Sequence, residues 1–243
     1  MRAYQTASMV LIIIALLIYS VRDGVPESAE VAQQKKGVML ILGEYLRSDY
    51  VESIRTNLSP MHSYLFGTPQ LVKVQDGETG LLLKPIFNFH EGGPDFILKK
   101  DGSVVVQIGA GYDTSNLLLE VHEANHFKIG FDKFKPTSYI FVGEASRYVA
   151  TVVLAGEYTD VQGQLYVFGT DGWAIFPDRK FEYQVGLDHI LNQYDYFDDR
   201  TSNKVYAFKR RDRVLEIFGT SGDINQFVDE RPILSLKQKT SKK

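Results

Sequence analysis

The sequence of 243 residues contains no cysteine, so it can form no disulfide bond, no thiolate metal site and no cysteine nucleophile. Basic residues are not in excess, with 27 lysines and arginines against 30 aspartates and glutamates, which argues against a nucleic-acid-binding surface. Glycine-rich phosphate loops and Gly-x-Ser-x-Gly nucleophile elbows are also missing. The content of 44% hydrophobic and 23% charged residues nevertheless predicts a folded chain.

One long apolar segment stands at the N-terminus. Residues 3–21 carry no charge and are flanked by Arg2 and Arg22, which is close to the ~20 residues that a membrane-spanning helix needs. A cleaved secretory signal is the alternative, but no small-x-small cleavage site is evident. We therefore expect residues 1–21 to form a transmembrane signal-anchor helix and residues 22–36 a linker. The bulk of the chain would then lie outside the cytoplasm, in a periplasmic or extracellular space.

The pattern changes after the linker. Leu42, Leu46, Val51, Ile54 and Leu58 follow one another at helix-compatible spacings. The Ser-Pro pair at 59–60 ends this pattern, because a residue before proline avoids the helical region. Residues 37–60 are therefore predicted to form a short amphipathic helical neck.

The rest of the chain has the features of antiparallel β-structure. Asp-Gly pairs at 101–102 and 171–172 stand between apolar runs, as in tight hairpin turns. Residues 181–185, 205–208 and 214–218 alternate with period two, and Asp212 lies in the turn between the last two runs. Residues 81–89, 140–142 and 148–154 are rich in the β-branched and aromatic side chains that strands favour. This cadence predicts one antiparallel β-barrel domain over residues 61–236, followed by a basic tail at 237–243.

The segment from Leu154 to Gly172, LAGEYTDVQGQLYVFGTDG, resembles the lipocalin-type (calycin) barrels. It opens with a Gly-x-aromatic strand at Gly156-Glu157-Tyr158 and continues into a run of antiparallel hairpins. The resemblance implies a closed barrel with a cavity for a small apolar molecule or a lipid. An eight-stranded barrel has room for one small ligand or for its own side chains, and the sequence leaves these alternatives open.

The segment His122-Glu123-Ala124-Asn125-His126 matches the His-Glu-x-x-His motif. On a helix, the two histidines would share one face and could bind zinc with Glu144, while Glu123 acted as the general base of a metallopeptidase. The runs at 117–121 and 127–131, however, each alternate like a strand. These flanks favour a hairpin, so the zinc peptidase is an alternative hypothesis.

Two further clusters are candidates for binding. His90 and Glu91 precede Gly92-Gly93-Pro94, and a loop of this kind often accompanies a binding function, so both are candidate ligand-binding residues. Residues 194–199 contain three carboxylates among aromatic side chains. This run could bind calcium but lacks the glycine of a calcium loop, and we expect a solvated turn.

The sequence thus predicts a mainly β, antiparallel, lipocalin-like barrel anchored in a membrane by its N-terminal helix. The expected role is non-catalytic, with no catalytic residue and no cofactor, and consists of binding a small apolar or lipid-like ligand. The alternatives are the zinc metallopeptidase and a structural or interaction module of a membrane-associated complex.

Overall fold

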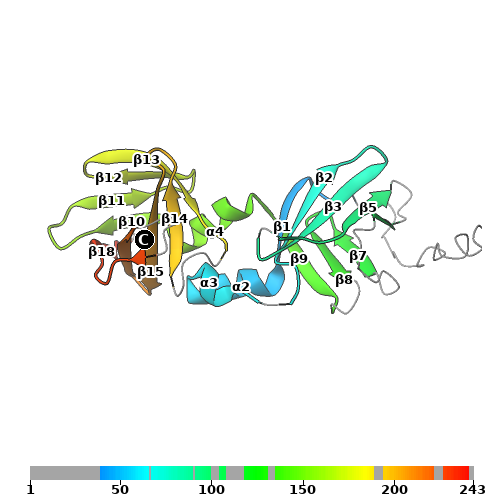
Figure 1. Cartoon of the computed structure of the whole chain (residues 1–243), viewed down its shortest axis with the longest axis horizontal. Coiled ribbons are helices and arrows are strands. Elements are labelled where there is room, and N and C mark those ends of the chain that lie inside the picture. The colour runs from blue at the N-terminus through cyan, green and yellow to red at the C-terminus, as the bar shows by residue number, and fades with distance from the viewer. Residues whose placement is uncertain are drawn as a thin grey trace, which may run out of the picture. The chain divides into compact units, whose positions relative to one another are not determined.

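A computed structural model describes residues 39–65, 67–89, 91–99, 104–107, 118–130, 135–188, 194–221 and 227–240, which belong to one unit, Val31–Lys243. Figure 1 labels its elements. The predicted transmembrane helix and linker, His90 and Asp101-Gly102 lie outside the described residues. Within the described ranges, no helix has the length and apolar character to span a bilayer.

The first half of the described chain forms an antiparallel sheet in the order β6-β5-β3-β2-β1-β9-β8-β7, with β4 paired to β3. Buried side chains of this sheet form one apolar core, which includes Tyr45, Phe96, Val121 and Phe127. These residues come from strands near both ends of the sheet as well as from its middle. The strands are β1 (Gly43–Arg47), β2 (Leu71–Asp76), β3 (Gly80–Phe87), β4 (Glu91–Gly92), β5 (Asp95–Lys99), β6 (Val104–Gln107), β7 (Leu118–Glu123), β8 (His126–Gly130) and β9 (Thr137–Gly143).

The second sheet closes on itself. Among the described residues, eight antiparallel strands form a barrel, because β18 pairs with both β16 and β10 and β15 pairs with both β14 and β16. The short β17 (Phe227–Val228) pairs with β16 outside this ring. The barrel strands are β10 (Gly156–Thr159), β11 (Leu165–Phe168), β12 (Trp173–Phe176), β13 (Arg179–Val185), β14 (Asp195–Asp199), β15 (Lys204–Arg211), β16 (Val214–Ser221) and β18 (Leu234–Gln238). The mainly β, antiparallel barrel architecture predicted from the sequence is therefore confirmed.

Several predicted hairpins are present. The turn at Asp171-Gly172 joins β11 to β12, with Gly172 at φ 86°, and Asp212 at φ 50° joins β15 to β16. β5 and β6, which flank the predicted turn at 101–102, also pair antiparallel. The barrel strand β18 extends to Gln238, into the predicted tail, because barrel closure pairs Lys237 with Thr159. The predicted boundaries of a single β domain, residues 61–236, stay a prediction.

The helices differ from the prediction in two places. The segment before the barrel contains less helix than predicted, and one helix lies where a strand was expected. The predicted helical neck at 37–60 is wrong over Gly43–Arg47, which form β1, and helix is confined to α2 (Ser48–Asn57) and α3 (Pro60–Ser63). The predicted strand at 148–154 is also wrong, because α4 (Ala145–Val153) occupies this stretch. The buried residues of α4 recur at helical spacing, and packing of this face overrides the β preference of its valines.

The barrel interior is filled by its own side chains. Aromatic rings from five strands meet there in edge-to-face pairs with centroids 5.0–6.0 Å apart, and such pairs stabilise beyond their buried area. The rings in these pairs are those of Tyr158, Tyr166, Phe168, Phe176, Phe181, Tyr183 and Phe197. Of the two uses of a barrel interior that the sequence left open, the side-chain core is the one observed.

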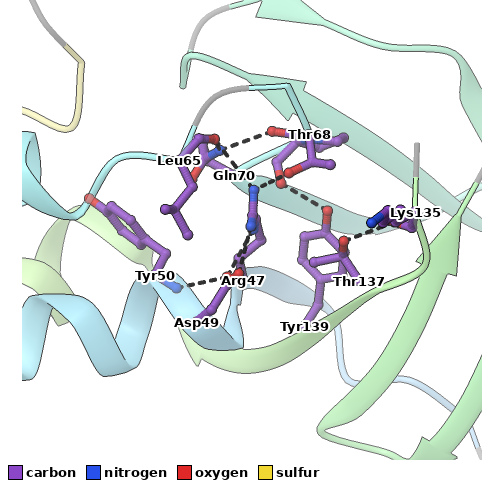
Figure 2. A network of polar contacts seen from close by, with 10 residues as sticks. Arg47, Asp49, Tyr50, Leu65, Thr68, Gln70, Lys135, Thr137 and Tyr139 are labelled. Carbon is purple, nitrogen blue, oxygen red and sulfur yellow. Dashed lines mark hydrogen bonds and ion pairs between the residues drawn. The ribbon is translucent and has the colours of Figure 1, made fainter. Parts of the chain in front are cut away.

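A buried arginine organises the junction between β1 and α2 (Figure 2). Arg47 donates to both carboxylate oxygens of Asp49, at 2.9 and 2.6 Å, and also to Thr68 Oγ1 and the Leu65 carbonyl. Gln70 accepts from the Arg47 N–H at 3.1 Å and donates to the carbonyls of Leu65 and Thr68. The planar guanidinium thus joins the first strand, the first helix and the loop before β2.

Replacement of Arg47 by lysine should destabilise the protein, because an ammonium group cannot reproduce this set of directed donors. We expect Arg47→Lys to lower the free energy of unfolding by about 2–3 kcal/mol, the scale of one or two charge-assisted hydrogen bonds. Arg55→Lys is the matched control, since exposed Arg55 donates only to Tyr148 Oη in the described contacts and should change stability by less than about 0.5 kcal/mol. Urea unfolding measures both, and equal effects would contradict this role of Arg47.

Candidate functional site at the mouth of the β-barrel

The two ends of the barrel differ. At one end α4 packs against the barrel, where Ser146 Oγ donates to the Val185 carbonyl at 2.8 Å and Arg210 donates to the Val153 carbonyl. Because antiparallel strands alternate in direction, the starts of β11, β13, β15 and β18 lie at the opposite end. We call this end, opposite α4, the barrel mouth.

A cleft of about 520 Å³ opens at the barrel mouth. This volume lies within the range of ~300–1,000 Å³ typical of small-molecule sites. Most of its wall is aromatic or aliphatic, and its remaining side chains are those of Arg179, Asp178 and Gln164. The lining includes Tyr166, Phe176, Tyr206, Ile217, Ile233 and Leu234.

Arg179 is held in place from three sides. Its Nη1 donates to Asp199 Oδ2 at 3.0 Å and its Nη2 donates to Tyr206 Oη at 3.0 Å. Its guanidinium carbon lies 4.6 Å from the centre of the Phe181 ring and 5.6 Å from that of Phe176, as in cation–π pairs. The side chain keeps 30% of its surface exposed, so a preoriented cation remains accessible at an apolar mouth.

Asp199 is buried beneath Arg179, with 1% of its side chain exposed. It accepts hydrogen bonds from the backbone N–H groups of Thr201 and Ser202 and from Ser202 Oγ, at 2.9, 3.0 and 2.7 Å. A buried carboxylate with this many donors is well satisfied, and it fixes both the turn after β14 and the arginine above it.

Asp195 is the second buried carboxylate of β14. Its Oδ1 accepts the Met61 N–H at 2.8 Å and so connects β14 to α3. Burial raises the pKa of this carboxyl to about 6, although the Met61 N–H, the Ser59 hydroxyl and His62 act in the opposite direction. The predicted solvated turn at 194–199 is therefore wrong, because residues 195–199 form a strand and two of the three carboxylates, those of Asp195 and Asp199, are buried and hydrogen-bonded.

The His-Glu-x-x-His segment lies on the β7–β8 hairpin, as its alternating flanks predicted, with Ala124 and Asn125 in the turn. The helix that a zinc peptidase of this motif needs is not formed here. Burial and the neighbouring His122 lower the pKa of His126. Glu144 lies before α4, where its carboxylate is 3.6 Å from Arg147 Nε. Within the described ranges, no three or more histidine and acidic side chains are already arranged to hold a metal ion.

The other predicted loop candidate is described only in part. His90 lies outside the described residues. Glu91 is exposed in β4 and accepts from Asn88 Nδ2 at 2.8 Å, and both Asn88 and Phe89 have positive φ values, of 47° and 62°. The turn lies at Asn88 and Phe89, ahead of the predicted loop, and Glu91 and Gly92 form β4, while the binding role of this segment stays a prediction.

Arg179 was not identified from the sequence, and Asp199 only as part of the run at 194–199 that was expected to form a solvated turn. A signal for Arg179 exists, because it lies in phase with the inward-facing Phe181, Tyr183 and Val185 of β13. A charged residue in register with a core face demands a partner, and the run at 194–199 supplies one 20 residues later.

No protein-family model, curated protein or solved structure matches this chain. The class of protein is thus defined by architecture. In its described residues, the chain combines a closed antiparallel β-barrel, a helix packed at one barrel end and a partly cationic, mostly apolar cleft at the other.

The raised pKa of Asp195 predicts a pH-dependent stability. Between its ordinary value of 3.8 and about 6, the folded state retains a proton that the unfolded chain releases, so stability falls as the pH rises. This contribution amounts to about 2–3 kcal/mol between pH 4 and pH 7. Asp195→Asn keeps an oxygen acceptor for the Met61 N–H and should remove this loss.

The measurement is urea unfolding of wild type and variant at pH 4, 5, 6 and 7. Asp199→Asn, on the same strand, is the matched control and should instead lower stability by about 1.5–3 kcal/mol, because it weakens the bond to Arg179. Parallel pH profiles for wild type and Asp195→Asn would show that Asp195 does not titrate as described.

Proposed function

We propose that this chain is a non-catalytic binding protein that takes a small, mainly apolar molecule with an anionic group at the barrel mouth. The observation that carries the proposal is the preoriented, partly exposed Arg179 in a cleft whose other lining residues are mostly apolar, with Asp178 and Gln164 as the exceptions. An arginine held by Asp199 and Tyr206 can form charge-assisted hydrogen bonds to a carboxylate or a similar anion without first losing side-chain freedom.

The mouth, and not the barrel interior, is the proposed binding place. Phe168, Phe181, Phe197 and Phe208 are at most 1% exposed, so a ligand within the barrel would have to displace tightly packed rings. The cleft needs no such rearrangement, because its volume is already open. An alkyl or aromatic body would lie against Ile217 and Leu234 with its anionic end at Arg179.

The proposal includes a lipocalin-like character and a membrane location. The closed antiparallel barrel supports the former, and the first barrel strand carries the Gly156-Glu157-Tyr158 segment on which the resemblance rests. The uncharged residues 3–21 support an N-terminal anchor and an extracytoplasmic place for the barrel. A binding site at the barrel mouth would suit an amphiphile taken from or delivered to a membrane.

An interaction module is the second candidate, and it rests on one observation. Leu165, Trp173 and Ile175 are each 40–48% exposed on the outer face of β11 and β12, where Val167 pairs with Ile175. Adjacent exposed apolar side chains on a sheet face are typical of contact sites. The ligand-binding proposal is preferred, because the mouth combines an open volume with a fixed polar anchor.

Binding of decanoate and decanol to the full chain tests the proposal by calorimetry. We expect decanoate to bind more tightly by about tenfold, the effect of one charge-assisted contact. Ile233→Asp places a negative charge beside the cleft on a side chain that is already 51% exposed, and should weaken decanoate binding by a similar factor.

Ile175→Asp is the matched control, because Ile175 is 48% exposed on the outer barrel face. It should leave decanoate binding unchanged while thermal unfolding shows both variants folded. Equal effects of the two substitutions, or equal affinity for the acid and the alcohol, would contradict a site at Arg179.

A further inference from the structure

Two imidazoles face the same side of the β7–β8 hairpin. Leu119, Val121, Phe127 and Ile129 are buried in the core of the first sheet, so the alternate residues Glu120, His122, His126 and Lys128 lie on the opposite face. A β-bulge between Val121 and Glu123 displaces His122 from regular pairing. The centres of the two imidazole rings are consequently 5.2 Å apart.

We propose that His122 and His126 chelate a zinc ion, that Glu120 turns toward the ion on binding to become a third protein ligand, and that water completes the coordination. Two imidazoles bound to one tetrahedral zinc ion at about 2.0–2.1 Å have ring centres roughly 5 Å apart, which is the separation observed. Two ligand atoms of such an ion are roughly 3.4 Å from each other, and His122 Nε2 lies 3.5 Å from Glu120 Oε2. The ring separation therefore fits one shared ion, and Glu120 lies close enough to His122 to join it once its side chain turns.

The backbone holds this site in place. The Ala124 carbonyl accepts from the Ile41 N–H at 3.0 Å and from Tyr45 Oη at 2.8 Å, and the Asn125 carbonyl accepts from the Phe141 N–H at 2.8 Å. The turn between the two histidines is thus fixed to β9 and to the chain that enters β1. A metal ion bound here would not have to order a loop first, which favours affinity.

The chemistry of the donors selects the ion. Imidazole nitrogens with one carboxylate suit a borderline dication such as zinc and disfavour magnesium or calcium, which prefer oxygen ligands. The site is not that of a peptidase, because the two histidines come from two strands and Glu123 pairs across the ladder with His126.

Lys128 is the group that opposes binding. Its Nζ lies 3.9 Å from Glu120 Oε2, so Glu120 must turn from Lys128 toward the ion to complete the site. Removal of this positive charge should raise the zinc affinity for two reasons. It frees Glu120 from its ion pair, and it removes the repulsion between Lys128 and the zinc ion. Lys128→Met is therefore a variant that tightens binding, a result that loss of a merely structural contact would not give.

Zinc titration of the full-length chain by calorimetry tests the proposal. Loss of a hydrogen-bond partner of a metal ligand alone costs ~10–100-fold in affinity, so His122→Gln and His126→Gln should each cost at least about tenfold. Glu120→Gln should weaken binding less, and Lys128→Met should strengthen it. With cobalt in place of zinc, wild type and Lys128→Met should show the visible absorption of a tetrahedral site, and the double variant His122→Gln/His126→Gln should not.

Two matched controls accompany these variants. His62→Gln changes a histidine of α3 that contacts Ser59, and Glu123→Gln changes the neighbouring acid of the same hairpin. His62→Gln should leave the zinc affinity unchanged, and Glu123→Gln should weaken it less than either histidine substitution, because it removes only a neighbouring charge. The proposal is overturned if wild type binds no zinc at millimolar concentration, or if the double variant His122→Gln/His126→Gln binds it as wild type does.

Discussion

The fold depends on a strand with two buried faces. In β1, consecutive residues face different cores, since Tyr45 belongs to the cluster of the first sheet and Leu46 to the cluster that α2, α4 and the barrel share, and both are fully buried. Because both faces of this strand are buried, its last residue, which directly precedes α2, must also be buried. Arg47 meets this requirement, because its guanidinium satisfies Asp49 and the carbonyls of the following loop while its stem stays buried.

The same principle of a satisfied buried charge explains β14. Asp195 and Asp199 stand at opposite ends of this strand and on the same side of it, where the alternating pattern would otherwise place apolar groups. Each is retained beside a specific donor, Met61 on α3 for the first and Arg179 at the barrel mouth for the second. α4 packs against one end of the filled barrel, and the binding site that we propose lies at the other end, where Arg179 is both fixed and accessible.

The sequence predicts those parts of this fold that local chemistry determines. The Asp171-Gly172 turn, the turn at Asp212 and the two strands around the His122–His126 turn could be predicted because positive φ values and period-two alternation are local. β1 could not, since its sequence Gly-Glu-Tyr-Leu-Arg has no period-two alternation and Leu42 and Leu46 fit the spacing of a helix. The α4 helix could not be predicted from its valines, because the packing that selects helix comes from barrel strands that follow it in the chain. Neither failure concerns a turn.

The two proposed sites also differ in how far they could be predicted from the sequence. His122 and His126 are four residues apart and could be paired from the sequence, but only the hairpin with its bulge determines that they meet across two strands and not along one helical face. Arg179 meets Asp199 over 20 residues and Tyr206 over 27, distances at which no spacing rule applies. What the sequence does contain is a charge in phase with a core face, and such a position costs too much free energy to persist without a partner. A charged residue in register with the core-facing residues of a strand is therefore a stronger indication of a polar site than a short motif. The motif His-Glu-x-x-His is compatible with a helix and with a hairpin. Arg179, in register with the core-facing residues of β13, instead requires an acceptor nearby.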